Sequence, residues 1–139
     1  MTTAHDWNNQ IINEFRANQG RVGGPSQGAP ILLLHHTGAK SGKARVNPLM
    51  YLADGDRLLV FASKGGAPTN PDWFHNLRAN PAATVEVGTA EFAVEAMEVT
   101  GEERDRLYAR QAGLYPPFGE YQAKAGRTIP VVALKRKSL

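Results

Sequence analysis

The sequence predicts one α+β domain spanning residues 1–139, most simply a small antiparallel β-barrel with short flanking helices. Three observations carry this prediction. The length of 139 residues is close to the commonest size of a single domain. Six apolar runs of strand length are separated by Gly, Asn, Asp and Pro turn signals, and amphipathic segments lie between some of them. No internal repeat or linker divides the chain.

The chain is predicted to begin with a helix and a loop. Asp6 is expected to cap the helix and Gly20 to end it. Its apolar positions share one helical face: Trp7, Ile11, Ile12 and Phe15. The segment Gly20–Pro30 contains several glycines and prolines, so we expect it to form a loop at the edge of the fold.

Three antiparallel strands are expected next, over Pro30–Thr37, Arg45–Ala53 and Arg57–Lys64. The first two are joined by a turn over Gly38–Gly42. Asp54-Gly55 marks a tight hairpin between the second and third, because both residue types tolerate positive φ.

The second half of the chain alternates in the same way. Its predicted elements are a helix over Pro71–Leu77 capped by Asn70, strands over Ala82–Val87 and Glu91–Val99, a helix over Glu102–Ala112 with a capping box at Thr100, a partly helical segment over Tyr115–Gly126, and a strand over Thr128–Lys135. Together with the first half, this gives six strands with short helices between them.

The formal net charge of +3 conceals a strong local asymmetry. Between Glu14 and Asp54 there is no acid, although the bases Arg16, Arg21, Lys40, Lys43 and Arg45 lie there. The stretch Glu86–Asp105 is instead rich in acids. A basic segment in an otherwise balanced chain predicts an anionic partner bound at one site. The aromatic residues are not interleaved with a basic stripe, so we expect no nucleic-acid partner.

Several classes of chemistry are excluded or disfavoured. The chain has no cysteine, which excludes disulfides, thiolate metal sites and a Cys nucleophile. The four histidines lack a metal-binding spacing, and the adjacent His35 and His36 must point to opposite faces of a strand, so no metal site is expected. The segment Gly38–Ala44 is too short for a phosphate-binding loop of the NTPase type and leads into a strand.

We expect a cytoplasmic protein without membrane insertion. The apolar runs are far shorter than the roughly 20 residues of a membrane-spanning helix. The first residues lack the basic start and apolar middle of a signal peptide.

The remaining groups suit a large planar anion. Lys40, Lys43 and Arg45 flank a Gly- and Ser-containing turn whose backbone N–H groups can approach phosphate or carboxylate oxygens. A second strand end, Ala62–Gly66, adds a base among small residues, and Trp73 supplies aromatic surface nearby in sequence. The alternative is that these bases merely solvate the tip of a hairpin.

Four linked motifs carry a family resemblance. They are Thr37-Gly-Ala-Lys-Ser-Gly-Lys-Ala-Arg-Val-Asn-Pro-Leu49, Ala62-Ser-Lys-Gly-Gly66, Asn70-Pro-Asp-Trp-Phe-His-Asn-Leu77 and Ala79-Asn-Pro81. In this order they closely resemble the deazaflavin-dependent nitroreductase family, and the match extends to Thr128-Ile-Pro130. The resemblance implies a six-stranded antiparallel split β-barrel of the FMN-binding type that uses coenzyme F420, a deazaflavin with a phosphate and an oligoglutamate tail.

The resemblance also implies the cofactor-binding residues. Lys40, Ser41 and Arg45 would hold the phosphate and the tail. Ala62, Ser63, Lys64 and Gly65 would line the deazaflavin ring, and Trp73 and Asn76 would close the groove. The resemblance implies no metal ion.

The acceptor pocket of the family corresponds to Tyr115-Pro-Pro-Phe-Gly-Glu-Tyr121 and to Met50. Phe118 and Met50 stand where tyrosines are found in the nitroreductase itself, so the pocket should be more apolar and the use of nitroimidazole prodrugs is in question. Ser63, Tyr115 and Tyr121 are the implied catalytic residues. Simple core packing is the alternative explanation of the aromatic residues.

The resemblance predicts an F420H2-dependent reductase that transfers a hydride to an electron-poor small molecule: a quinone, an enone, an activated coumarin or a nitroaromatic. Two alternatives stay open. The split barrel could bind FMN or a haem-related group in place of F420, or it could carry a cofactor without catalysing turnover. A homodimer is compatible with the wider superfamily.

Overall fold

The computed structural model describes the backbone of residues 4–21 and 29–137 and the side chains of residues 8–21 and 29–137. Most of the predicted loop Gly20–Pro30 and the side chains of Asp6 and Trp7 therefore lie outside the described part. Within the described residues, no helix has both the length and the apolar character needed to cross a membrane.

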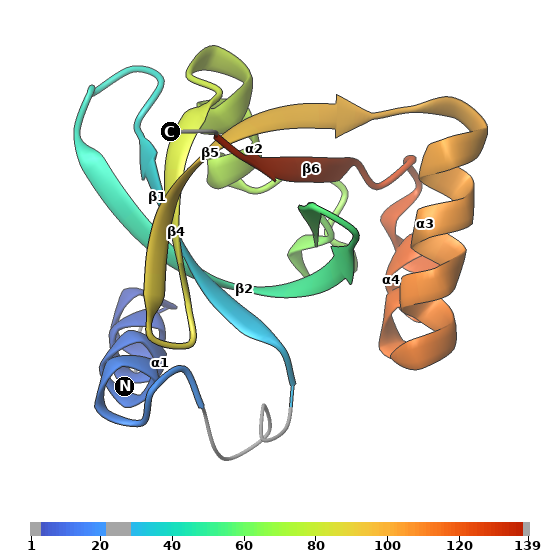
Figure 1. Ribbon diagram of the computed structural model, residues 1–139. Coiled ribbons are helices and arrows are strands. Elements are labelled where there is room, and N and C mark those ends of the chain that lie inside the picture. Colours follow the sequence, from blue (N-terminus) through green and yellow to red (C-terminus); the bar gives the residue numbers. More distant parts are fainter. Residues whose placement is uncertain (1–3, 22–28, 138–139) are drawn as a thin grey trace.

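The described residues form six strands and several short helices (Figure 1). In chain order they are α1 (Ala4–Ala17), β1 (Ile31–Thr37), β2 (Ala44–Asp54), β3 (Arg57–Phe61), the short 3-10 helix η2 (Lys64–Gly66), α2 (Asp72–Ala79), β4 (Ala82–Val87), β5 (Ala90–Val99), α3 (Gly101–Leu114), α4 (Pro117–Ala125) and β6 (Val131–Arg136).

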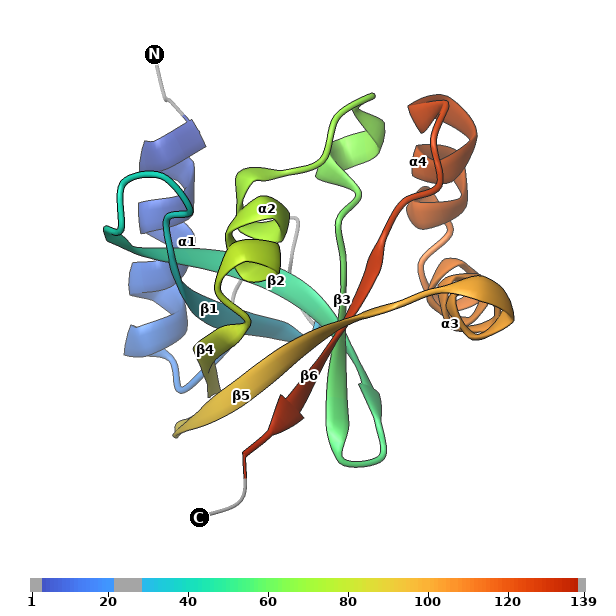
Figure 2. The ribbon, with the colours of Figure 1, turned by 90° about the horizontal axis from the view of Figure 1, so that it is seen from above.

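The strands close into a barrel in the order β1-β2-β3-β6-β5-β4. Every neighbouring pair is antiparallel, and β1 closes the barrel by pairing with β4 through Leu33 and Glu86, Leu34 and Val85, and His35 and Thr84. The predicted six-stranded antiparallel barrel is confirmed. Figures 1 and 2 show α1 at one side of the barrel and α3 with α4 at the opposite side.

Side chains alternate between the two faces of β1, and each face packs against a different part of the molecule. Leu32 and Leu34 are buried in the barrel interior with Val60, Val85 and other core residues. Leu33, which points the other way, packs against Phe15 and its neighbours on α1. A strand with apolar residues on both faces is buried on both, because one face fills the barrel and the other binds a helix.

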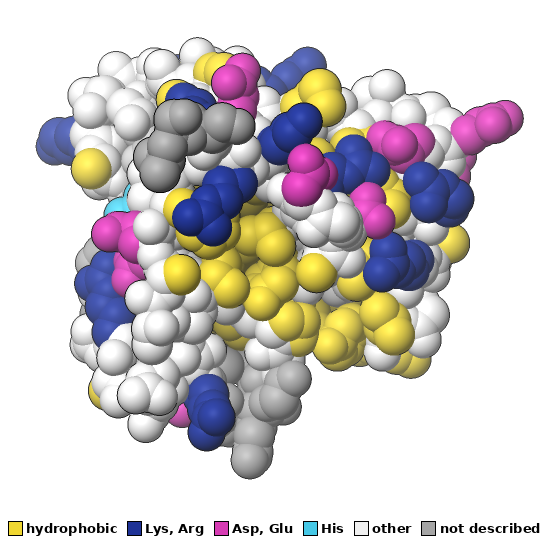
Figure 3. All heavy atoms as spheres, in the orientation of Figure 1, with side chains coloured by type: hydrophobic (Ala, Val, Ile, Leu, Met, Phe, Trp, Pro, Cys, Tyr) yellow, Lys and Arg dark blue, Asp and Glu magenta, His cyan; other side chains and the backbone are white. Residues whose placement is uncertain are grey.

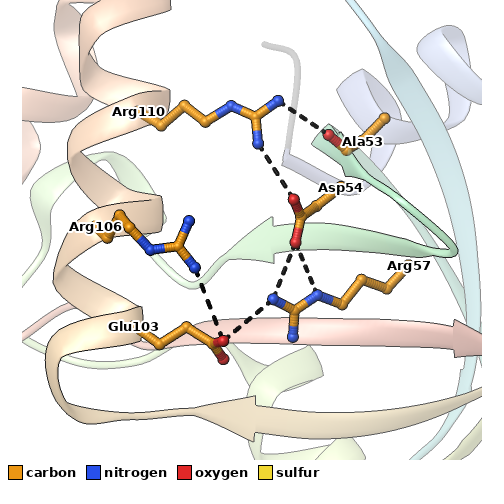
Figure 4. Close-up of polar contacts among 6 residues, drawn as sticks. All are labelled: Ala53, Asp54, Arg57, Glu103, Arg106 and Arg110. Atoms are coloured by element: carbon orange, nitrogen blue, oxygen red, sulfur yellow. Dashed lines mark hydrogen bonds and ion pairs between the residues drawn. The ribbon is translucent and has the colours of Figure 1, made fainter.

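A second core lies between the barrel wall and the pair of helices α3 and α4. Phe61, Val131 and Ala133 face Leu107 and Tyr108 in this cluster. A polar network holds the outer side of α3 against the β2–β3 hairpin (Figure 4). Asp54 accepts hydrogen bonds from Arg57 at 2.9 Å and from Arg110 at 3.3 Å. These contacts hold α3 against the hairpin, and α4 follows α3 directly in the chain.

Three local predictions were wrong. The predicted strand Arg57–Lys64 ends at Phe61, because Ser63 adopts helical dihedral angles and Lys64 has a φ of +47°. Asn70 does not cap α2; the residue before the helix is Pro71, and the Asn70 amide oxygen accepts a hydrogen bond from Arg127 instead. The helix α1 begins at Ala4, so Asp6 lies inside it.

Other boundaries shift slightly. Thr100 is the residue before α3, as predicted, but its side chain makes no capping hydrogen bond. The segment Tyr115–Gly126 contains a regular helix, α4, which ends at Gly126 with a φ of +67°.

Candidate functional site

An open cleft of about 480 Å³ lies between the barrel and α4. Its walls come from β1, β2, the end of β3, η2, the start of α2 and the segment around α4. Eight of the predicted site residues line it: Met50, Ser63, Lys64, Gly65, Trp73, Tyr115, Phe118 and Tyr121. The structure thus brings three of the four expected ring-binding residues, Ser63, Lys64 and Gly65, and the expected acceptor-binding residues into one cleft.

Aromatic contacts fix the wall of this cleft on the α4 side. The Phe118 ring meets the rings of Phe61 and Tyr121 edge-on, with centroids 5.8 Å and 5.3 Å apart. The Tyr108 hydroxyl donates to the Phe118 carbonyl at 2.6 Å. Burial raises the pKa of Tyr108, so its phenol stays protonated as the donor. Phe118 therefore packs against the core and also lines the cleft. Core packing and acceptor binding, the two explanations of these aromatic residues, do not exclude one another.

The loop at the end of β3 supplies the polar side of the cleft. Ser63 is nearly buried, and its carbonyl accepts a hydrogen bond from the Gly66 N–H at 2.9 Å. Lys64 is exposed, and its ammonium donates to Thr69 at 3.3 Å. The cleft therefore combines an apolar wall with a hydroxyl and a cation at one edge.

The predicted phosphate-binding residues lie at the β1–β2 turn. Lys40, Ser41 and Arg45 are all exposed there, and they are not among the residues that line the cleft. The turn is closed by hydrogen bonds from Gly38 N to the Lys43 carbonyl at 2.9 Å and from Gly42 N to the Gly38 carbonyl at 3.0 Å. Figure 2 shows this turn, α2, η2 and α4 on the same side of the barrel.

Asn76 joins the turn to the barrel. The Asn76 amide oxygen accepts a hydrogen bond from the Ala39 N–H at 2.9 Å, and its amide nitrogen lies 3.1 Å from Nδ1 of His36. The other ring nitrogen of His36 lies 2.7 Å from the amide oxygen of Asn47. His36 is 4% exposed, and this burial is the main cause that lowers its pKa. A neutral ring with its proton on Nε2 satisfies both contacts.

Two predicted cofactor-binding residues, one expected to line the ring and one expected to close the groove, are not among the residues that line the cleft. Ala62 is fully buried in the barrel core, and Asn76 is 7% exposed and engaged with the β1–β2 turn. The family resemblance predicted that Asn76 closes the groove. Its side chain lies instead behind the β1–β2 turn, where it binds the Ala39 N–H.

Sequence reasoning missed the residues that position the site. His36 could have been noticed as the inward-facing member of the His35-His36 pair, because it shares the face of Leu32 and Leu34. Arg127, which ties the chain after α4 to the loop after β3, carries no local signal, since its partner Ala67 lies 60 residues away in the chain. Gln122 holds the Arg127 carbonyl, only five residues further along the chain.

A second polar cluster lies where α1 meets the barrel. Glu86 accepts hydrogen bonds from Arg16 at 2.8 Å and contacts His35 at 2.5 Å, and a Glu91 oxygen lies close to both His35 and Glu86. The hydrogen bond from Arg16 is the main cause that lowers the pKa of Glu86. Because a guanidinium already occupies this carboxylate, we assign the cluster to helix docking and not to a metal.

Comparisons with known proteins identify the class. The chain belongs to the F420H(2)-dependent quinone reductase family, whose sequence model matches residues 7–136. The F420H(2)-dependent quinone reductase Rv1261c of Mycobacterium tuberculosis is 43% identical over 129 residues, which cover 88% of this chain and 85% of the relative.

Two solved structures are similar to this chain. An F420-H2 dependent reductase, FDR-A, is 42% identical with a TM-score of 0.70, and the match covers 76% of this chain and 94% of that one. A second structure, described as a domain-swapped dimer, is 38% identical with a TM-score of 0.71, and the match covers 96% of this chain and 100% of that one. The resemblance to F420-dependent split-barrel reductases, drawn from the sequence motifs, is confirmed.

Proposed function

We propose that this protein is a reductase that binds reduced F420 in the cleft and transfers a hydride to a quinone. One observation carries the proposal: a cleft walled by aromatic residues and a turn bearing exposed cations lie on the same side of the barrel (Figure 2). A cofactor with a flat ring at one end and a polyanionic tail at the other matches this division.

The charges around the site support the choice of a polyanion. Within the described part of the chain, the ion pairs between side chains include none made by Lys40, Lys43, Arg45 or Lys64. These cations are therefore free to pair with a phosphate and carboxylates. At an effective dielectric constant near 20, one base about 4 Å from one acid gains about 4 kcal/mol before desolvation. Lys40, Ser41 and Arg45 would hold the tail.

Bound F420H2 would supply the hydride, and the protein would supply position and polarity. The rigid wall made by Phe118 and its ring neighbours would align a flat acceptor, which lowers the entropic part of the barrier. The Ser63 hydroxyl, at the edge of the cleft, would stabilise negative charge that develops on the acceptor oxygen. Tyr115 and Tyr121 offer the cleft phenols that could donate a proton.

A quinone is the preferred acceptor for two reasons. The relatives described above are named quinone reductases. The cleft also carries Met50 and Phe118 where the related nitroreductase has tyrosines, which leaves an apolar wall suited to an uncharged ring. Enones, coumarins and nitroaromatics are the secondary acceptors that this reasoning allows.

The cofactor assignment is tested by titrating the purified protein with F420 and, separately, with FMN. We expect tight binding of F420 and much weaker binding of FMN. Tight FMN binding without F420 binding would overturn the proposal. Tight F420 binding without turnover of any quinone or enone would favour the alternative, a carrier protein.

The role of Ser63 is tested by a single-turnover measurement on Ser63→Ala. Hydride transfer should slow by about tenfold or more, as expected when one polarising group is lost. An unchanged rate would remove Ser63 from the catalytic residues.

We also propose that two copies associate. Figure 3 shows hydrophobic side chains gathered across the middle of one face of the molecule, with charged side chains mostly around them. An exposed apolar patch of this kind is typical of an interface, and one similar structure is a domain-swapped dimer. Light scattering on the purified protein should give the mass of a dimer, whereas a monomer mass at high concentration would contradict this.

A further inference from the structure

The loop after β3 holds a backbone conformation that side chains rarely adopt. Lys64, Gly65 and Gly66 follow one another with φ angles of +47°, +63° and +86°. The two glycines adopt these angles without steric cost, whereas the Cβ of Lys64 makes its positive φ unfavourable. Such a conformation persists when contacts from elsewhere hold it, and it occurs at functional sites.

Arg127 makes these contacts. Its guanidinium donates to four backbone carbonyls, those of Ala62 at 3.2 Å, Ser63 at 3.3 Å, Ala67 at 3.1 Å and Thr69 at 2.9 Å. It also donates to the side chain of Asn70. All five acceptors lie within residues 62–70, so one planar group ties together both ends of the loop that carries Ser63 and Lys64.

Arg127 is itself fixed to α4. The Gln122 amide donates to the Arg127 carbonyl, and the Gln122 amide oxygen accepts from Arg104 and from the Ile129 N–H. The helix also presses on the loop directly, because a Cβ at Gly66 would lie 3.2 Å from the Tyr121 Cα. The aromatic wall and the polar edge of the cleft are thus joined through Arg127 and Gly66.

The charge of Arg127 is not used in an ion pair with any carboxylate in the described residues. Its partners are neutral carbonyls spread around the fork of the guanidinium. A lysine would keep the charge but could not reach several divergent acceptors at once. The geometry of the side chain, and not its charge, is what the loop requires.

We propose that Arg127 is the positioning residue of the cofactor site: it holds residues 62–70 in the strained conformation that presents Ser63 and Lys64 to F420. This inference rests on the proposed function for the identity of the ligand. The mechanical part of it, that Arg127 orders the loop, concerns the protein alone.

The test compares Arg127→Lys with wild type and with Arg110→Lys. Arg110 is a matched control, because it also donates to a backbone carbonyl, that of Ala53 in β2, which lies outside residues 62–70. Amide hydrogen exchange is measured without cofactor at Gly66 and Ala67, whose N–H groups bond to the Ser63 and Lys64 carbonyls. F420 affinity and the kcat and KM of turnover are measured in parallel.

We expect Arg127→Lys to speed exchange at Gly66 and Ala67 and to raise the Kd for F420, each by about tenfold, with kcat at saturating F420H2 little changed. The amides of β3 and β6 and the Arg110→Lys protein should behave as wild type. Wild-type exchange and affinity in Arg127→Lys, or faster exchange throughout the barrel, would overturn the proposal. If wild type bound no F420, the proposed function would fail, and the exchange result would still decide whether Arg127 orders the loop.

Discussion

Asn76 on α2 donates a hydrogen bond to Nδ1 of His36 on β1, over 3.1 Å, in a buried position behind the β1–β2 turn. Because Asn76 also accepts a hydrogen bond from the Ala39 N–H, one amide links the barrel interior to the turn that bears Lys40. The acceptor role of His36 requires a neutral ring. Protonation of His36 would place a second proton against the Asn76 amide and weaken the link.

The first prediction concerns pH. Burial lowers the pKa of His36, so the unfolded chain binds a proton near the usual value of about 6.5 while the folded protein resists it. Stability should therefore fall as the pH drops below about 6.5 and level off below the folded pKa. Urea unfolding at a series of pH values measures this. His36→Gln, which keeps a donor and an acceptor, should lose the dependence, and His75→Gln should keep it.

This window is separate from that of the carboxylates. Hydrogen bonds from Arg16 and Arg57 are the main causes that lower the pKa values of Glu86 and Asp54. Their contribution to stability is present above the unfolded pKa of about 4 and is lost as the pH falls further. A stability curve that stays flat down to about pH 5 would contradict the role given to His36.

The second prediction concerns salt. Lys40→Ala and Arg45→Ala should each weaken F420 binding by up to about fivefold at low salt, since an exposed ion pair contributes up to about 1 kcal/mol. The loss should shrink at high salt, where the charges are screened. Fluorescence titration measures both. The deazaflavin without its phosphate and tail is the chemical control, and Lys135→Ala is the protein control; equal losses with the truncated ligand would contradict the assignment of the turn.

The third prediction concerns Phe118. Its ring is held edge-on against Phe61 and Tyr121, so Phe118→Leu should leave a looser wall. A quinone ring would also lose its own aromatic contact with Phe118, worth about 0.5–1.5 kcal/mol, so the KM for a quinone should rise by about twofold to tenfold. The Kd for F420 should hardly change. Leu114→Ala, at a side chain that is 58% exposed, is the matched control, and a rise in the F420 Kd equal to that in the quinone KM would argue against an acceptor wall.

The fourth prediction concerns Gln111, which is fully buried on α3. Its amide oxygen has no hydrogen-bond partner among the residues that the structure describes, and its amide nitrogen makes one long contact of 3.6 Å to the Met50 sulfur. Gln111→Leu should stabilise the protein by about 1 kcal/mol, since it removes an unpaired buried carbonyl. Gln122→Leu, which deletes an amide that makes three hydrogen bonds, should destabilise it. Urea unfolding compares the two, and destabilisation by both would show that Gln111 has a partner.

The barrel could be predicted because its information is local. Leu32, Leu33 and Leu34 occupy both faces of one strand. The hairpin predicted at Asp54-Gly55 lies one residue further on: Asp54 still pairs with Arg57, and Gly55, with a φ of +61°, makes the turn together with Asp56. The end of β3 could not be predicted in this way. The apolar run continues to Ala62, and what turns the chain is a positive φ at Lys64 and the contacts of Arg127 from far along the sequence.

In the candidate site, too, the residues of local motifs could be predicted, whereas positions that depend on the packing of distant elements could not. Ser63 and Trp73 of the linked motifs and Tyr121 of the acceptor segment line the cleft as expected. The contacts of Asn76 differ from its expected place, because the position of a side chain behind a turn depends on how α2 crosses β1. Propensity and motif order carry no information on that crossing.

The most direct test of the central claim is quinone-dependent oxidation of F420H2 by the wild-type protein, followed by the return of the oxidised deazaflavin absorbance. With a soluble naphthoquinone, we predict turnover that saturates in both F420H2 and quinone and that exceeds the rate without protein. Reduced FMN should support no comparable turnover. Quinone reduction with reduced FMN, together with none from F420H2, would contradict the account.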